Sequence, residues 1–356
     1  MKKIAVVVGA RPQFIKLAPV VEIFSDKVKL VIIHTGQHYD FEMSDVFFHQ
    51  LNLPQVDYHL GIGSDSQAAQ VGRMMIELEK VFVKESPDMT AVIGDTNSTL
   101  AGALAAAKNN IPLAHIEAGL RSNNNHLPEQ INRVVTDHLS NIFCCPTQSS
   151  VDHLKAEGIK NGIFLTGDIL YDVIDRIIPD DEFIDSFLAE NNLKPGDYIL
   201  FTVHRAENAD SIDFLQALVA GLENLPWQIF LPLHPRTKGK LEEFGLMNRL
   251  SAIANVRISE PVGIIESLAL TKSSLGVMTD SGGLQREAAF FGKKSYILRD
   301  ETEWLELKRC GAVVCIKSDL RNTEFDWNSY SSPGSEYFQK ASQKIADCII
   351  NALYMK

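Results

Sequence analysis

The sequence predicts an α/β fold with two domains, each built on a doubly wound and largely parallel sheet. Short apolar, β-branched segments alternate with helix-length segments along the whole chain, and they lack the period-2 pattern of a strand with one solvated face. The chain has 356 residues, whereas a single hydrophobic core stops growing near ~250–300 residues. Two domains with parallel strands buried on both faces explain both observations.

The expected strands follow one another at regular intervals in each half of the chain. In the first half they are residues 4–8, 30–34, 90–94, 113–116, 142–145 and 163–166, and in the second half residues 198–202, 228–232, 256–259, 275–279, 295–298 and 313–316. Helical patterns separate them. We therefore expect one domain at residues 1–168 and the other at 169–335, with a hinge near 167–171. An acidic surface helix and loop follow at 179–197, and a last helix at 336–356 closes the chain.

Composition narrows the class of protein. Hydrophobic residues at 45% and charged residues at 22% exclude a disordered or coiled-coil chain. A net charge of -11 without a basic run argues against a nucleic-acid partner. No apolar stretch reaches the ~20 residues of a membrane span, so we expect a cytoplasmic protein. Five cysteines without paired ligand spacing predict reduced thiols and no metal site.

The first strand runs into the segment Gly9-Ala10-Arg11-Pro12-Gln13-Phe14-Ile15-Lys16. Backbone N–H groups at the start of the following helix, together with Arg11 and Lys16, would suit a phosphate. An ordinary strand-to-helix turn with two solvated bases explains the same residues equally well. The segment lacks G-x-G-x-x-G, which weighs against a dinucleotide site.

Carboxylates follow two further strands of the first half. Asp95 stands in Gly-Asp-Thr-Asn-Ser-Thr and Glu117 in His-Ile-Glu-Ala-Gly-Leu-Arg-Ser, and Glu129 follows Pro128. Each acid also has a structural interpretation. Asp95 could be the N-cap of the following helix, and Glu129 could serve merely to stabilise the dipole at a helix start. If Asp95 and Glu117 project into one cleft, repulsion would raise one pKa and leave the other acid ionised.

The second half places cationic and glycine-rich segments at its expected strand ends. His204-Arg205 and His234-Pro235-Arg236 form a cationic rim for an anionic ligand. In Asp-Ser-Gly-Gly-Leu-Gln-Arg-Glu, the backbone of Ser281, Gly282 and Gly283 can approach a pyrophosphate, and Glu287 can accept from ribose hydroxyls. A plain helix cap at Asp280 or Ser281 explains less, because it does not require two glycines.

The segments GARPQFIK, GDTNST, HIEAGLRS, PEQINR, HRAEN, HPRT and DSGGLQREA resemble, in order and spacing, the non-hydrolysing UDP-N-acetylglucosamine 2-epimerase family. The resemblance covers nearly the whole chain. It implies a glycosyltransferase-B type architecture, in which two Rossmann-like domains face a cleft and the second domain holds most of the UDP. It also implies that the C-terminal helix, residues 336–356, crosses back to the first domain.

The resemblance also assigns roles to individual residues. It implies three catalytic carboxylates, Asp95, Glu117 and Glu129, and a catalytic-site histidine, His204. Other matched positions would bind the nucleotide sugar: Arg11, Lys16, Arg133, Arg205, His234, Ser281, Gly282, Gly283 and Glu287. Gln37 and His38 match a segment of the family's allosteric site. A UDP-sugar substrate, a homodimer and no cofactor or metal are further implications.

The family's reaction is elimination of UDP to a 2-acetamidoglucal, followed by re-addition with C2 inverted, which interconverts UDP-GlcNAc and UDP-ManNAc for surface polysaccharide precursors. Gln13 and the segments 204–208 and 300–304 look more like the branch that includes UDP-2,3-diacetamido-2,3-dideoxyglucuronate 2-epimerases. Three rivals stay open: a sugar transferase of the same architecture, a nucleotide-sugar sensor, and a hydrolysing epimerase. The three acids argue against the transferase and the sensor.

Overall fold

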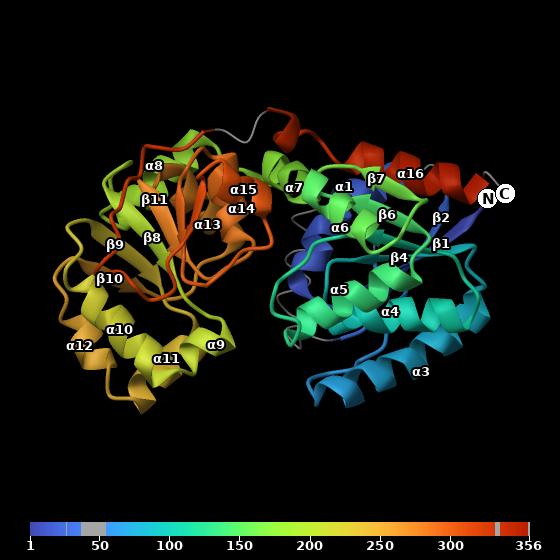
Figure 1. The fold of residues 1–356 in the computed structure, drawn as a ribbon, viewed down its shortest axis with the longest axis horizontal. Coiled ribbons are helices and arrows are strands. Elements are labelled where there is room, and N and C mark those ends of the chain that lie inside the picture. The colour runs from blue at the N-terminus through green and yellow to red at the C-terminus, as the bar shows by residue number, and fades with distance from the viewer. Residues whose placement is uncertain (26, 37–54, 332–334, 355–356) are drawn as a thin grey trace. The chain divides into compact units, whose positions relative to one another are not determined.

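The structure of the protein is a computed structural model that describes residues 1–25, 27–36, 55–331 and 335–354, without the side chains of residues 11, 12, 335 and 336. Its contacts divide the chain into two compact units. Unit 1 is Met1–Val173 with Tyr337–Lys356, and unit 2 is Ile174–Glu336. Each unit holds one parallel sheet with helices packed against it (Figure 1). The predicted α/β class with two Rossmann-like domains is confirmed.

Unit 1 contains a seven-stranded sheet in the order β3-β2-β1-β4-β5-β6-β7, and every described pairing in it is parallel. The strands are β1 (Lys3–Val8), β2 (Lys29–His34), β3 (Tyr58–His59), β4 (Met89–Ile93), β5 (Leu113–Ile116), β6 (Ile142–Cys145) and β7 (Ile163–Leu165). The strand order reverses between β1 and β4. In open parallel sheets ligands bind at the carboxyl ends of the strands beside this reversal.

Helices cover both faces of this sheet because alternate residues of its central strands are apolar in both directions. In β1, Ile4 and Val6 enter one core with the C-terminal helix, whereas Ala5 and Val7 enter another. The helices that the unit contributes are α1 (Arg11–Ser25), α3 (Gln67–Glu85), α4 (Asn97–Lys108), α5 (Pro128–Leu139), α6 (Gln148–Ala156), α7 (Ile169–Ile177) and α16 (Ser342–Tyr354). Helix α7 continues a few residues into unit 2.

Unit 2 contains a six-stranded parallel sheet in the order β10-β9-β8-β11-β12-β13. The strands are β8 (Tyr198–Thr202), β9 (Gln228–Pro232), β10 (Val256–Ser259), β11 (Gly276–Thr279), β12 (Ser295–Ile297) and β13 (Val313–Cys315). The helices are α8 (Asp181–Glu190), α9 (Ala206–Ala209), α10 (Ile212–Leu222), α11 (Pro235–Glu243), α12 (Met247–Ser251), α13 (Ile264–Ser273), α14 (Leu284–Phe290) and α15 (Leu305–Arg309). Here the strand order reverses between β8 and β11.

The C-terminal helix begins later than the sequence pattern indicates. Residues Ser335–Phe338 form a short 3₁₀ turn, and α16 begins at Ser342 rather than at residue 336. Its start is set by Asp172, whose carboxylate accepts from the backbone N–H of Ala341 at 2.7 Å, and from the backbone N–H and hydroxyl of Ser342 at 3.1 and 2.5 Å. An acceptor 170 residues away in sequence cannot be found from the local pattern.

Among the described helices, none is both long and apolar enough to cross a membrane.

Candidate active site

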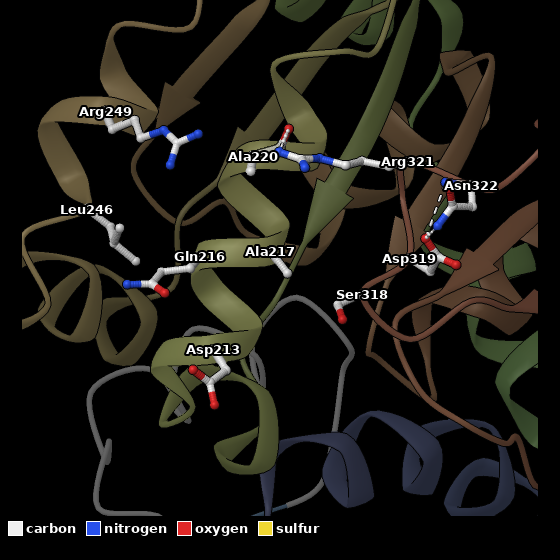
Figure 2. A pocket seen from close by; sticks show the side chains of 10 residues that line it. All are labelled: Asp213, Gln216, Ala217, Ala220, Leu246, Arg249, Ser318, Asp319, Arg321 and Asn322. Carbon is white, nitrogen blue, oxygen red and sulfur yellow. Dashed lines mark hydrogen bonds between the residues drawn. The ribbon is translucent and has the colours of Figure 1, made fainter.

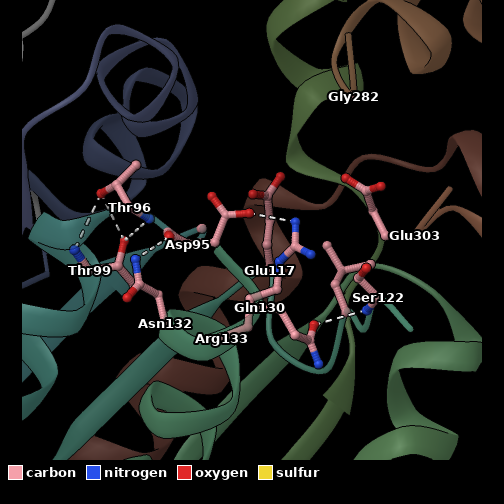
Figure 3. A network of polar contacts seen from close by, with 12 residues as sticks. Asp95, Thr96, Thr99, Glu117, Ser122, Gln130, Asn132, Arg133, Gly282 and Glu303 are labelled. Atoms are coloured by element: carbon pink, nitrogen blue, oxygen red, sulfur yellow. Dashed lines mark hydrogen bonds and ion pairs between the residues drawn. The ribbon is translucent and has the colours of Figure 1, made fainter. Parts of the chain in front are cut away.

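The two strand-end acids of unit 1 lie on adjacent strands. Strands β4 and β5 pair so that Ile93 faces Ile116, and the backbone N–H of Gly94 donates to the Ile116 carbonyl at 3.0 Å. Asp95 and Glu117 follow these positions directly, as Figure 3 shows. The Glu117 side chain is buried, whereas that of Asp95 keeps 28% of its surface exposed. The structure therefore brings the two acids to one edge of the sheet.

Each of these acids has its own cation. Lys16 Nζ from α1 lies 2.6 Å from Glu117 Oε2, and Arg133 Nη2 from α5 lies 2.5 Å from Asp95 Oδ2. The sequence predicts repulsion between the two acids if both project into one cleft. In the structure a cation contacts each carboxylate directly, so each acid also has an attractive partner. Lys16 and Arg133, both predicted to bind substrate, thus also hold the acids in place.

Asp95 does not cap the following helix. The cap of α4 is Thr96, which forms a capping box with Thr99: the Thr96 hydroxyl accepts from the Thr99 N–H, and the Thr99 hydroxyl from the Thr96 N–H. Asn132 donates to the Asp95 carbonyl at 2.9 Å and fixes the peptide from α5. The capping alternative for Asp95 is therefore wrong, and its carboxylate is available for chemistry.

Glu117 occupies a strained backbone conformation. Its φ is +68°, in the left-handed region that costs a residue with a Cβ about 1–3 kcal/mol and that clusters at functional sites. Gly119, two residues later, has a φ of +79°, and a Cβ added there would lie 2.3 Å from the Ser150 carbonyl oxygen. The turn after β5 is therefore tight, and the surrounding protein must stabilise it.

Gln13 connects the first turn of unit 1 to the turn that carries Asp95. Its amide oxygen accepts from the N–H groups of Gly9 and Ala10 at 2.8 and 3.0 Å. Its amide nitrogen donates to the Ile93 carbonyl at 2.6 Å and the Thr99 hydroxyl at 2.9 Å. The sequence indicated only that Gln13 is typical of one branch of the family. Its role in holding the two turns together was not predicted, because its partners are backbone atoms or side chains distant in sequence.

The remaining predicted residues of unit 1 fall into two groups. Glu129 is exposed in the first turn of α5, directly behind Pro128, where a carboxylate also favours the helix dipole. Its catalytic role stays a prediction. The side chain of Arg11, and both Gln37 and His38, lie outside the described residues.

In unit 2, Asp280 organises the loop that carries His204. Its buried carboxylate accepts from the backbone N–H groups of His204 and Arg205 at 3.1 and 2.9 Å and from the Asn208 amide at 3.1 Å. His204 Nδ1 also lies 3.3 Å from Asp280 Oδ1. Asp280 follows β11 and His204 follows β8, which are neighbours in the sheet. The alternative of Asp280 as a cap of α14 is wrong, since its acceptor sites serve the β8 loop.

His204 and His234 lie together at neighbouring strand ends. Their ring centroids are 5.8 Å apart, and Nδ1 of His234 accepts from the Arg236 N–H at 3.2 Å. Partial burial, with the nearby His204, lowers the pKa of His234. A neutral ring whose Nδ1 is an acceptor carries its proton on Nε2, so His234 can donate one hydrogen bond to an anion.

Some hydrogen-bonding groups of the glycine-rich turn before α14 already have partners within the protein. The Ser281 N–H donates to the Thr279 hydroxyl at 2.9 Å, and the Ser281 hydroxyl accepts from the Leu284 N–H at 3.2 Å. A Cβ added to Gly282 would lie 3.2 Å from Oε1 of Glu303. Of the three predicted backbone donors, the Ser281 N–H is thus already engaged within the turn.

Burial raises the pKa of Glu287 to about 7, although the nearby Arg286 opposes the rise.

The segment at residues 299–304 is packed onto α14. Arg299 and Glu303 form a buried ion pair at 3.0 Å, which the sequence allowed as a salt-bridged loop. The Thr302 hydroxyl donates to the Gln285 amide oxygen at 2.6 Å, and the Arg286 guanidinium lies over the Trp304 ring, 4.2 Å from its centroid. The segment therefore supports the glycine-rich turn, which the sequence alone did not reveal.

A polar hollow elsewhere on unit 2 includes none of the predicted residues. It is lined by α10, α12 and the segment 318–322, with Asp213, Arg249 and Arg321 among its side chains (Figure 2). Arg249 forms a two-pronged ion pair with Glu223 at 2.7 and 2.8 Å. We assign this hollow no part in the chemistry.

Comparison with known proteins identifies the family of the chain. Residues 22–342 match the sequence family described as UDP-N-acetylglucosamine 2-epimerase. A UDP-N-acetylglucosamine 2-epimerase from Methanocaldococcus jannaschii is 42% identical over 88% of each chain. A UDP-2,3-diacetamido-2,3-dideoxy-D-glucuronate 2-epimerase from Pseudomonas aeruginosa is 44% identical, also over 88% of each chain. The chain belongs to the UDP-N-acetylglucosamine 2-epimerase family.

Solved structures of epimerases share this fold. The Methanocaldococcus jannaschii UDP-GlcNAc 2-epimerase, in complex with UDP-GlcNAc and UDP, superposes with a TM-score of 0.86 at 38% identity, covering 98% of this chain and 99% of that one. The Neisseria meningitidis UDP-GlcNAc 2-epimerase bound to UDP-GlcNAc superposes with a TM-score of 0.81 at 27% identity, covering all of both chains. The predicted family and its enzyme class, an isomerase, are confirmed, and the transferase alternative is not supported.

Proposed function

We propose that this epimerase interconverts UDP-GlcNAc and UDP-ManNAc without releasing free sugar. The observation that carries the proposal is the pair of carboxylates Asp95 and Glu117, each held by its own cation at adjacent strand ends, in a chain of this family. Two fixed carboxylates are what an inversion at carbon requires, since one must remove a proton and another must deliver one to the opposite face.

The reaction begins with departure of UDP, because the C2 proton of the sugar is not adjacent to a carbonyl and is poorly acidic. The C1–O bond breaks with its electron pair remaining on UDP, a carboxylate takes the C2 proton, and a C1–C2 double bond forms. Re-addition reverses these changes, with a proton delivered from the opposite face. Asp95 and Glu117 serve as the proton-transfer groups, and Glu129 is the third candidate acid.

The diphosphate is held by residues of unit 2. His204, Arg205 and His234 donate to the leaving charge, and the backbone at Gly282 and Gly283 approaches the pyrophosphate, with Ser281 shaping the turn. Glu287 accepts from the ribose hydroxyls. Donors aimed at a developing charge typically supply a large part of the rate, and UDP departure supplies the activation without a cofactor.

Incubation with UDP-GlcNAc in D2O, followed by proton NMR, tests the proposal. Formation of UDP-ManNAc with deuterium at C2 supports epimerisation through proton loss, whereas free ManNAc would show a hydrolysing enzyme. Asp95→Asn and Glu117→Gln should each lower turnover by about 10²- to 10⁴-fold while UDP still binds. Full turnover in both variants would refute the assignment and favour a nucleotide-sugar sensor. His204→Ala should weaken both turnover and UDP binding.

A second candidate substrate is UDP-2,3-diacetamido-2,3-dideoxy-D-glucuronate. The relative from Pseudomonas aeruginosa that carries this activity in its name is 44% identical, close to the 42% of the Methanocaldococcus jannaschii UDP-GlcNAc enzyme. Sequence identity therefore does not choose between the sugars. A comparison of kcat/KM for the two substrates under one set of conditions decides, and the larger value identifies the natural substrate class.

The wider setting is also part of the proposal. We place the enzyme in the cytoplasm as a homodimer that supplies surface polysaccharide precursors, with Gln37 and His38 in an allosteric UDP-GlcNAc site. Light scattering of the purified protein tests the dimer. Initial rates measured with and without added UDP-GlcNAc, on UDP-ManNAc as substrate, test the allosteric site, and loss of any activation in His38→Ala is expected.

A further inference from the structure

A buried network that the mechanism has not used adjoins both strand-end acids. His115 lies in β5, two residues before Glu117, and its side chain is fully buried. Its ring lies between two oxygen atoms: Nδ1 is 2.7 Å from Oδ1 of Asp137, on α5, and Nε2 is 2.8 Å from the carbonyl oxygen of Gly94. Gly94 is the residue before Asp95.

Both ring nitrogens of His115 must carry protons. The Gly94 carbonyl can only accept a hydrogen bond, so Nε2 donates to it. Asp137 is ionised, because its other oxygen accepts from the Gly119 N–H at 3.1 Å and from Arg121 Nη1 at 2.6 Å. Burial opposes this charge, but His115 and Arg121 outweigh it and lower the pKa of Asp137. The Nδ1 of His115 therefore donates as well, and both ring nitrogens serve as hydrogen-bond donors.

Opposite charges alternate outward from this ring. Asp137 lies between His115 and Arg121, and Arg121 forms two further bonds of 2.7 Å with Glu157, the residue directly after α6. His138 reaches Glu157 at 3.3 Å from the solvent side. Buried ion pairs add little to stability, since their desolvation offsets their attraction. Their geometric effect is clearer here, because the network contacts the backbone of both turns that carry the acids.

We propose that His115, paired with Asp137, is a positioning residue for the epimerase reaction. The proposal rests on the proposed roles of Asp95 and Glu117. His115 fixes the Gly94 carbonyl and hence the peptide that leads into Asp95, while Asp137 fixes the Gly119 N–H two residues after Glu117. One charged pair thereby sets the spacing of both proton-transfer groups.

The backbone of these turns needs such support. Glu117 has a φ of +68°, which is strained for a residue with a Cβ, whereas Gly94 and Gly119 reach +69° and +79° without strain. The strained conformation of Glu117 persists only where surrounding contacts over-determine it. The hydrogen bonds to Gly94 and Gly119 lie on the two sides of the acids, so their loss allows the turns to relax. A displacement near 1 Å can reduce turnover by about 10²-fold.

His115→Gln tests the geometry. Its amide nitrogen can still donate to the Gly94 carbonyl, but both of its protons are on that one nitrogen, and the atom left for Asp137 is the amide oxygen, which cannot donate. We expect kcat to fall by about 10- to 100-fold, with KM and UDP affinity within about twofold. The double variant His115→Gln/Asp137→Asn should recover much of this loss, because the introduced glutamine oxygen can accept from the introduced asparagine amide. A double variant no better than the single one would overturn the proposal.

Gly162→Ala is the matched control for general destabilisation of unit 1. Its added Cβ would lie 2.1 Å from the Asn141 carbonyl oxygen, and neither residue contacts the network. We expect it to lower Tm at least as much as His115→Gln and to leave kcat within about twofold at a temperature where it is folded. If its kcat falls like that of His115→Gln, stability explains the loss and the positioning role is wrong.

Nitrogen-15 NMR of histidine-labelled protein tests the hydrogen bonding without activity. Under the conditions of the activity assay, two ring N–H signals should be assigned to His115 by their absence in His115→Gln, since both ring nitrogens donate. A single ring N–H would overturn this assignment. If wild-type protein epimerises neither sugar, the proposed function fails, yet this signal still reports the network.

Discussion

Glu117 and Lys16 form a buried ion pair, with 2.6 Å between Oε2 and Nζ, although 101 residues separate them in sequence. The pair connects the helix after β1 to the turn after β5. A residue that the family pattern assigns to substrate binding is therefore also the fixed counter-charge of a proposed proton-transfer group. Under the proposed role of Lys16, substrate binding and the placement of Glu117 depend on the same side chain.

Lys16→Met should destabilise the protein by about 3 kcal/mol, because it removes the ammonium that contacts the buried Glu117 carboxylate at 2.6 Å. The double variant Lys16→Met/Glu117→Gln removes both charges and should be more stable than the single variant. Urea unfolding of the three proteins measures both effects. A single variant as stable as wild type would show that water replaces the ammonium.

Gln13→Glu should destabilise the protein by about 1–3 kcal/mol at neutral pH. The new carboxylate faces the Ile93 carbonyl, to which the amide donates at 2.6 Å, and can donate nothing to it. The loss should shrink at low pH, where a protonated carboxyl regains one donor. Urea unfolding at neutral and acidic pH measures this, and a gap that does not shrink with acid would contradict it.

Gly119→Ala should destabilise the protein by about 3 kcal/mol, since strain at positive φ adds to overpacking. Its Cβ would lie 2.3 Å from the Ser150 carbonyl oxygen, whereas a Cβ on Gly158 meets nothing within 4 Å. Gly158 has a φ of +88°, so Gly158→Ala carries only the strain of about 1–2 kcal/mol. Equal losses in Tm for the two variants would show that the Ser150 backbone moves aside.

Asp172→Ala should lower the free energy of unfolding by about 2 kcal/mol, because three donors at the start of α16 lose their acceptor. This value is towards the upper end for loss of a helix cap. Asp180→Ala is the comparison. Asp180 caps the exposed start of α8 through one bond of 2.8 Å to the Phe183 N–H, and its loss should cost about 1 kcal/mol. The reverse order of the two losses, measured by chemical denaturation, would contradict the proposed importance of this cap.

Glu287 should make stability depend on pH. Its pKa is raised by burial from the ordinary value of 4.5 to about 7, so between these values the folded chain binds a proton that the unfolded chain has released. Stability therefore falls as pH rises through this window. Relative to Glu287→Gln, wild type should lose stability between pH about 4.5 and 7 and no more above it. If the two proteins differ in free energy of unfolding by the same amount across this range, the pKa of Glu287 is not raised.

The regular part of the fold was readable from sequence because parallel strands buried on both faces are continuous apolar runs. Strands such as β5, β6 and β8 begin and end at the expected residues, whereas β3, only Tyr58–His59, has no such run. Asp95 and Glu117 were found because strand-end acids follow those runs. His115 and Asp137 were missed, since a buried histidine in an apolar strand acquires meaning only through an acceptor on another element.

The path of the chain also constrains how the protein can form during synthesis. Unit 2 is one continuous segment, whereas unit 1 includes the last residues of the chain. Ile345, Ile349 and Leu353 of α16 are buried in the same core as β1. Domains generally fold as units while the chain emerges from the ribosome, the N-terminal one first. Here the N-terminal core stays incomplete until α16 has been synthesised, after the whole of unit 2. Its apolar surface is therefore exposed to chaperones and to aggregation while unit 2 is being made, and deletion of α16 would destabilise unit 1.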